Sequence, residues 1–103
     1  MAAEVTPPAL AVAYLAAYFR RNGYVRLPNQ DRRHAASRTY KKGYEVRLVA
    51  NSETELAIIR HLLRAVGFEP GRAFVHASQW RQPIYGRQAV AHFLVLIGWK
   101  PDA

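Results

Sequence analysis

The hydrophobic positions along the chain predict helices and strands in alternation, beginning with an almost uninterrupted apolar segment. Residues 9–19 are apolar throughout, follow Thr6 and Pro7, and lead into two arginines before Asn22 and Gly23. A hydroxyl cap followed by proline is typical of a helix start, and glycine is typical of the position after a helix end. The segment therefore predicts a helix that ends at about Asn22.

Strict alternation of apolar and polar residues predicts strands after this helix. It is clearest in residues 44–51, where apolar side chains alternate with Glu45 and Arg47. Such a period of two is typical of a strand with one buried face. Residues 24–27 predict a shorter strand, and the polar residues 28–43 connect the two.

The second helix has recognisable signals at both ends. Ser52 and Glu55 match the S-x-x-E capping box, and Gly67 marks the end. Arg60 and Arg64 are expected on its more exposed side. Its buried stripe is expected to consist of Leu56, Ile59, Leu62, Leu63 and Val66.

The last third of the chain predicts two more strands and a helix. The strands are expected at residues 71–80 and 81–86, where Pro83 indicates an edge or a bulge, and the helix at 87–99. The element order is then αββαββα. This predicts an α+β domain over residues 7–103, with a four-stranded antiparallel sheet and helices packed on one face, after a flexible tail at residues 1–6.

Charge points toward a nucleic-acid partner. The formal net charge is +8, and lysine and arginine together number 15 against 7 acidic residues. Arginine binds phosphate and guanine edges with paired hydrogen bonds, so a strongly basic small domain favours nucleic acid, although incidental surface charge is the alternative.

Several other kinds of site and classes of protein are excluded by the sequence or have no support in it. The chain has no cysteine, which excludes disulfides and cysteine-based zinc sites. Its four histidines show no metal-ligand spacing, and no cofactor is expected. The longest apolar run is shorter than the roughly 20 residues of a membrane span, so we expect no membrane partner and a cytoplasmic location.

The first helix lacks a polar face over residues 9–19, so it must be covered on two sides. A second copy of the same helix could supply the second cover, which predicts a homodimer. Small side chains let two backbones approach closely, and the expected interface residues are Ala13, Ala16, Ala17 and Arg20. A helix buried wholly within one monomer is the alternative.

The segment LAAYFRRNG, residues 15–23, resembles the motif of LAGLIDADG homing endonucleases. Leu15, Ala16 and Gly23 match the motif, and Ala17 stands at its first glycine. The αββαββα order and the basic connection resemble that family's half-domain over residues 9–99. The resemblance implies a dimer that holds duplex DNA against the concave face of its sheet.

The sequence departs from the family at the position that carries its chemistry. The residue before the final glycine is usually an acid that binds a divalent metal, and here it is Asn22, while Arg20 occupies the other acidic place. Metal-assisted phosphodiester hydrolysis needs carboxylate ligands. The resemblance therefore implies DNA binding without a catalytic residue or metal. Asn22 as a plain helix cap is equally compatible.

The resemblance also implies which side chains meet DNA. Alternation leaves Tyr24, Arg26, Glu45 and Arg47 on the open face of the first two strands. The whole expected set of DNA-binding residues is Tyr24, Arg26, Arg32, Arg33, Arg38, Lys41, Lys42, Glu45, Arg47, His76, Ser78 and Arg81.

Three rival functions stay open at this point. The first is an active endonuclease in which Glu45 or Asp31 replaces the missing ligand. The second is an RNA-binding protein resembling intron maturases. The third is a structural dimer whose positive charge is incidental.

Overall fold

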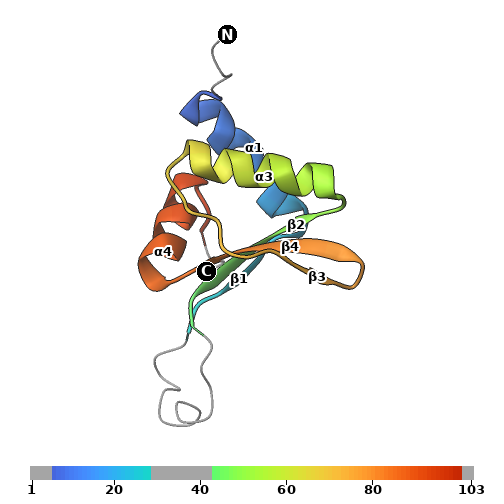
Figure 1. The fold of residues 1–103 in the computed structure, drawn as a ribbon. Coiled ribbons are helices and arrows are strands. Elements are labelled where there is room, and N and C mark those ends of the chain that lie inside the picture. The colour runs from blue at the N-terminus through green and yellow to red at the C-terminus, as the bar shows by residue number, and fades with distance from the viewer. Residues whose placement is uncertain (1–5, 29–42, 101–103) are drawn as a thin grey trace.

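The computed structural model describes residues 6–28 and 43–100, which form an α+β domain (Figure 1). A four-stranded antiparallel sheet lies beneath a layer of helices, as the sequence predicts. The elements, in chain order, are α1 (Pro8–Asn22), β1 (Tyr24–Arg26), β2 (Glu45–Ala50), α3 (Glu53–Ala65), β3 (Phe74–His76), β4 (Gln79–Tyr85) and α4 (Arg87–Leu96).

The strand order in the sheet is β1-β2-β4-β3. Two hairpins, β1–β2 and β3–β4, are joined by the long β2–β4 pairing, in which Glu45 lies opposite Tyr85 and Ala50 lies opposite Trp80. β3 pairs only with Gln79–Arg81, so at Pro83 the edge of β4 that faces away from β2 has no neighbouring strand. This arrangement accommodates a residue that cannot donate a ladder hydrogen bond.

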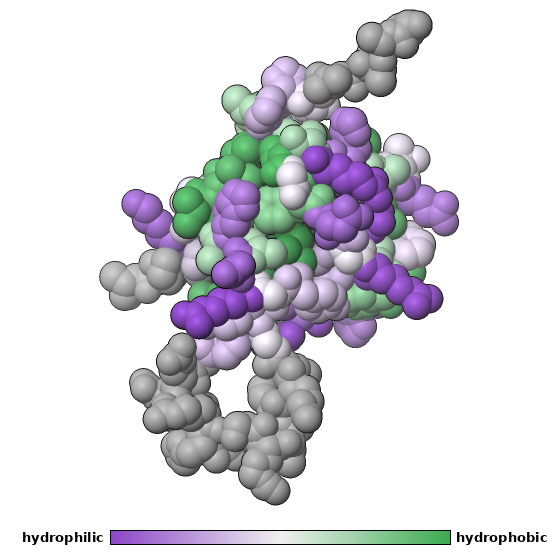
Figure 2. All heavy atoms as spheres, turned by 60° about the vertical axis from the view of Figure 1, so that its left-hand side comes forward, coloured by the Kyte–Doolittle hydropathy of each residue, from purple (hydrophilic) through white to green (hydrophobic). Residues whose placement is uncertain are grey.

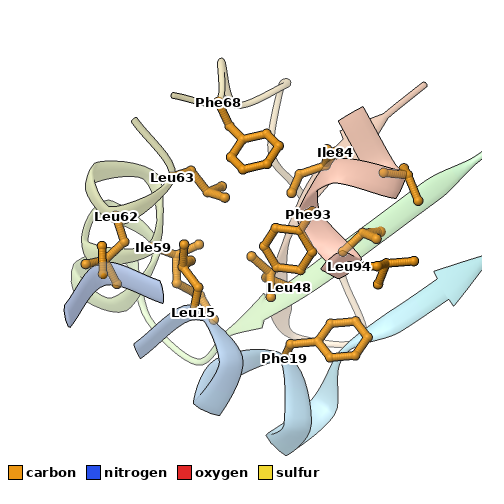
Figure 3. Packing of buried hydrophobic residues seen from close by; sticks show 14 residues of the cluster. Leu15, Phe19, Leu48, Ile59, Leu62, Leu63, Phe68, Ile84, Phe93 and Leu94 are labelled. Atoms are coloured by element: carbon orange, nitrogen blue, oxygen red, sulfur yellow. The ribbon is translucent and has the colours of Figure 1, made fainter. Parts of the chain in front are cut away.

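The core lies between the sheet and the three helices (Figure 3). Leu15 and Phe19 of α1, Leu48 of β2 and Phe93 of α4 are all buried there. The Phe19 and Phe93 rings meet edge to face with centroids 6.1 Å apart. Burial of such side chains contributes roughly 1.5–3 kcal/mol each, so this cluster is the main stabilising feature of the domain.

The helix ends differ in part from the expected caps. Ser52 Oγ accepts from the Glu55 backbone N–H at 3.1 Å, as the capping box predicts, while the Glu55 carboxylate accepts from the Asn51 backbone N–H at 2.8 Å. Thr6 does not cap α1, because Pro7 is its N-cap residue and Thr6 Oγ1 instead lies 3.0 Å from His61 Nε2. The link joins the start of α1 to α3.

Arg60 is not the exposed residue that helical periodicity predicts. Its Nη1 donates to Gln82 Oε1 at 2.6 Å and to the Gly71 carbonyl at 2.8 Å. The Gln82 side chain is completely buried on the helical side of β4, and its amide nitrogen donates to the Gly71 carbonyl at 2.9 Å. This network satisfies polar groups that would otherwise be costly to bury.

The β3–β4 turn lies at Ala77 and Ser78, earlier than the boundary expected near residue 80. Both residues have positive φ, 53° and 66°, in a two-residue hairpin connection. Side chains other than glycine, asparagine and aspartate are disfavoured there, and type I′ hairpin turns prefer Asn-Gly.

Replacing both residues, Ala77→Asn with Ser78→Gly, is therefore expected to raise the free energy of unfolding by about 1 kcal/mol. Chemical denaturation of the purified protein measures the change. Ala91→Asn on the exposed side of α4 is the control, and it is expected to lower stability slightly because asparagine is a poor helix former. If the double substitution and Ala91→Asn changed the free energy of unfolding equally, the backbone at Ala77 and Ser78 would not be strained.

Candidate nucleic-acid interface

The face of the sheet opposite the helices is the candidate interface. Residues paired directly across an antiparallel sheet point to the same face, so the register identifies the members of this open face. Tyr24 pairs with Arg47, Arg26 with Glu45, and Glu45 with Tyr85. The open face comprises Tyr24, Arg26, Glu45, Arg47, Val49, Phe74, His76, Gln79, Arg81, Pro83 and Tyr85.

Glu45 is the only acidic residue of the open face, and it is almost completely buried, at 1 % exposure. Arg26 Nη2 lies 2.6 Å from one carboxylate oxygen and Arg47 Nε lies 2.5 Å from the other. The sequence places Glu45 correctly on this face, but it predicts an exposed side chain. Both arginines cover it instead, so Glu45 is positioned to hold these two side chains.

Arg47 is held on three sides. Its guanidinium carbon lies 5.2 Å from the centroid of the Tyr24 ring and 5.3 Å from that of the Phe74 ring, within cation–π range. The hydrogen bond to Glu45 raises the pKa of Arg47 despite the opposing effect of burial. Arginine stays charged in proteins, so Glu45 and the two rings hold a positive charge on the open face.

The far end of the face is formed by the β3–β4 hairpin. His76 and Ser78 are exposed there. Arg81 Nη2 lies 3.4 Å from the His76 carbonyl oxygen, while its buried Nε has no partner in residues 6–28 and 43–100. Gln79 donates to Asn51 Oδ1 at 2.7 Å, which ties the hairpin to the end of β2.

The polar connection between β1 and β2 carries the remaining predicted contacts. Arg32, Arg33, Arg38, Lys41 and Lys42 lie outside the described residues. The segments that flank this connection leave the sheet at the end where Arg26 pairs with Glu45. Arg26 also donates through Nε to the Gly43 carbonyl at 2.9 Å, which fixes one flank of the connection against β1.

The C-terminal turn of α1 carries the residues that resemble the endonuclease motif. Arg20 and Asn22 are exposed, and Asn22 is the last helical residue. Arg21 points elsewhere: it donates to Glu55 Oε1 at 2.8 Å and to the Val49 carbonyl at 2.9 Å. The bond with Arg21 and the Asn51 amide lower the pKa of Glu55. Arg21 therefore links α1 to α3 and β2.

The residues expected at a dimer interface divide into two groups. Ala13, Ala17 and Arg20 are exposed on α1, whereas Ala16 is only 6 % exposed and packs inside the domain. Leu10 and Tyr14 extend the exposed set with exposures of 47 % and 51 %. Hydrophobic side chains also gather over the helical layer in Figure 2. The α1 stripe is defined here as Leu10, Ala13, Tyr14 and Ala17.

No group of three histidine or acidic side chains that could hold a metal ion occurs among residues 6–28 and 43–100. Within the same ranges, no helix is long and apolar enough to cross a membrane. Comparison with protein-family models, with curated proteins and with solved structures found no match.

Sequence patterns did not reveal every member of the open face. Alternation identified Tyr24, Arg26, Glu45 and Arg47, and the register confirms their placement. Tyr85 lies inside the strand expected at residues 81–86, but only Arg81 of that strand was assigned to the face; Tyr85 is 57 % exposed opposite Glu45. The alternation in QWRQPIY, with Gln79, Arg81 and Tyr85 on one side, is the signal that could have found it.

Proposed function

We propose that this protein binds duplex DNA on the open face of its sheet, acts as a homodimer and does not cleave the DNA. The observation that carries the proposal is the composition of that face. Arg26, Arg47 and Arg81 lie among aromatic side chains, and the only carboxylate is buried beneath two of the arginines. Basic side chains attract phosphate, and arginines also distinguish bases in the major groove.

Charge elsewhere in the sequence supports the same function. The connection between β1 and β2 contains five lysines and arginines against one acid, and the whole chain carries a net charge of +8. The resemblance to LAGLIDADG endonucleases supports duplex DNA over other polyanions. The cytoplasmic location remains an expectation from the sequence.

The α1 stripe supports the homodimer. Leu10, Ala13, Tyr14 and Ala17 follow one another at helical spacing and are exposed in the single chain. Packing the stripe against its own copy would remove two tyrosines and two leucines from water, and the alanines between them would permit close approach. Such a dimer would carry two open faces.

The contacts of Glu45 argue against the endonuclease rival that uses it as a metal ligand. Each of its oxygens already accepts from an arginine, at 2.6 and 2.5 Å. A divalent cation would have to displace both charged partners. Asn22 and Arg20 likewise offer no carboxylate at the end of α1. Magnesium-dependent nicking of plasmid DNA by the pure protein would favour the endonuclease.

Binding to duplex DNA is expected to depend strongly on salt. Each neutralised phosphate contributes a slope of about −0.9 in a plot of log affinity against log salt. Three or four contacts for each subunit of a dimer give a slope of roughly −5 to −7. The double substitution Arg32→Ala with Arg33→Ala is expected to flatten the slope by up to about 4 and to weaken all sequences alike.

Fluorescence anisotropy with a labelled duplex at several salt concentrations measures this slope. Arg64→Ala is the control, because Arg64 is exposed on α3 in the helical layer. A parent slope near zero would show that the charge is incidental. Tighter binding of structured RNA than of duplex DNA would favour the maturase-like rival.

A further inference from the structure

Arg47 has an orientation that leaves one particular edge of its guanidinium unoccupied. Nε donates to Glu45 Oε2 at 2.5 Å, and Nη2 lies 3.4 Å from Oε1, so the carboxylate occupies the Nε–Nη2 edge. A guanidinium carries five N–H donors. Nη1 and the second hydrogen of Nη2 have no partner among the described residues.

The flanking rings limit how a ligand can approach this edge. Tyr24 and Phe74 lie on either side of the Arg47 guanidinium at 5.2 and 5.3 Å. The side chain retains 30 % exposure, so it remains accessible from the open face. A planar acceptor pair that meets the Nη1–Nη2 edge would accept two parallel hydrogen bonds without any rearrangement of Arg47.

Guanine offers such an acceptor pair. In the major groove its O6 and N7 are adjacent acceptors, whereas each other base presents a different pattern there. We propose that Arg47 recognises a guanine in bound duplex DNA through these two atoms, and that Glu45 is the positioning residue that holds Arg47 for this contact. The inference rests on the proposed function.

A positioning role explains why a negatively charged residue, Glu45, lies on a face that binds DNA. A carboxylate on a DNA-binding face opposes phosphate, so simple electrostatic binding would be stronger without it. Glu45, in contrast, already restrains Arg47 before DNA binds. Arg47 therefore loses less side-chain entropy when it contacts a base. Glu45 therefore lowers general affinity and increases discrimination among sequences.

Arg26 provides the internal comparison. It shares Glu45, with Nη2 at 2.6 Å, but its Nε is also bound to the Gly43 carbonyl at 2.9 Å. Its side chain is less exposed than that of Arg47, at 20 % against 30 %. Arg26 is thus held at the end of the sheet by two separate acceptors, and its role is to fix Glu45 and the chain at Gly43.

The test begins by selecting bound duplexes from a randomised library with the full chain. Each guanine of the selected duplex is then replaced by 7-deazaguanine, which retains O6 and lacks N7. For one guanine position the parent is expected to lose about tenfold in affinity. In Arg47→Met this loss should disappear, because methionine donates no hydrogen bond, while Arg64→Met on the exposed side of α3 should retain it.

Glu45→Gln separates positioning from simple stabilisation of the fold. It preserves the shape of the side chain and removes its charge. The 7-deazaguanine effect should shrink at least threefold, whereas affinity for unselected duplex should hold or rise. A uniform loss of affinity, with the effect intact, would assign Glu45 a structural role only and overturn the inference.

The outcomes also distinguish a failure of DNA binding from a failure of guanine recognition by Arg47. If no duplex is bound in a salt-dependent manner, the proposed function fails and the inference fails with it. If duplexes are bound but no guanine is sensitive to 7-deaza replacement, or the sensitivity persists in Arg47→Met, DNA binding stands and the role of Arg47 is wrong.

Discussion

The substitution Ala13→Glu is expected to convert a dimer into a monomer while leaving the fold intact. Ala13 is exposed at the middle of the α1 stripe, so a glutamate there meets water in the single chain. In a paired helix it would be buried near its own copy without a partner. Burying unpaired charge costs several kcal/mol, so the dissociation constant should rise at least 100-fold.

Light scattering combined with size-exclusion chromatography measures the molecular mass of both proteins. Ala57→Glu is the matched control, because Ala57 is exposed on α3 and the same chemical change is made in a helix. Ala16 is unsuitable for this test, since its burial inside the domain would confuse dissociation with unfolding. A parent protein that is already monomeric at all concentrations would refute the paired helix.

Gly23→Ala is expected to lower the free energy of unfolding by about 2–4 kcal/mol. The backbone of Gly23 has an ordinary extended conformation, with φ −71°, so conformational freedom is not the reason for glycine. A Cβ atom there would lie 2.5 Å from the Phe19 carbonyl oxygen and would also collide with the Phe19 ring. Phe19 belongs to the core and contacts Phe93, so it cannot move freely.

Urea denaturation gives the free energies for this comparison. Gly43→Ala is the matched control, because a Cβ at that position meets nothing within 4 Å. We expect that control to change stability by less than about 0.5 kcal/mol. If both variants had the same midpoint urea concentration of unfolding as the parent, the close approach between Gly23 and Phe19 would not constrain the fold.

The fold class and most elements could be predicted because they depend on local periodicity. The alternation around Glu45 and Arg47 and the stripe of Ile59, Leu62 and Leu63 are each set by neighbours within a few residues. The helical stripe gives the buried face as well as the element type, whereas every residue of β2 except Arg47 is buried, on both faces of the strand. The order of elements then leaves few arrangements for a single sheet with helices on one side.

The features that could not be predicted depend on contacts between distant residues. Arg60 has the spacing of an exposed helical residue, yet Gln82, 22 positions away, accepts its hydrogen bond. Burial of Glu45 follows from Arg26, 19 positions away, together with its neighbour Arg47. The β3–β4 turn was misplaced because Ala77 and Ser78 lack the usual turn residues.

The pairing of Arg26 with Glu45 has a consequence for how the protein could change during evolution. This pair is the last of the β1–β2 ladder, so the chain leaves the sheet after residue 26 and rejoins it at residue 45. Loop-closure entropy grows slowly with length, and doubling a connection costs only about 0.6 kcal/mol. A longer or shorter connection between these two residues would therefore cost little in loop-closure entropy. During evolution the sequence of this basic connection, and with it the ligands that the protein binds, could therefore change while natural selection preserves the folded core.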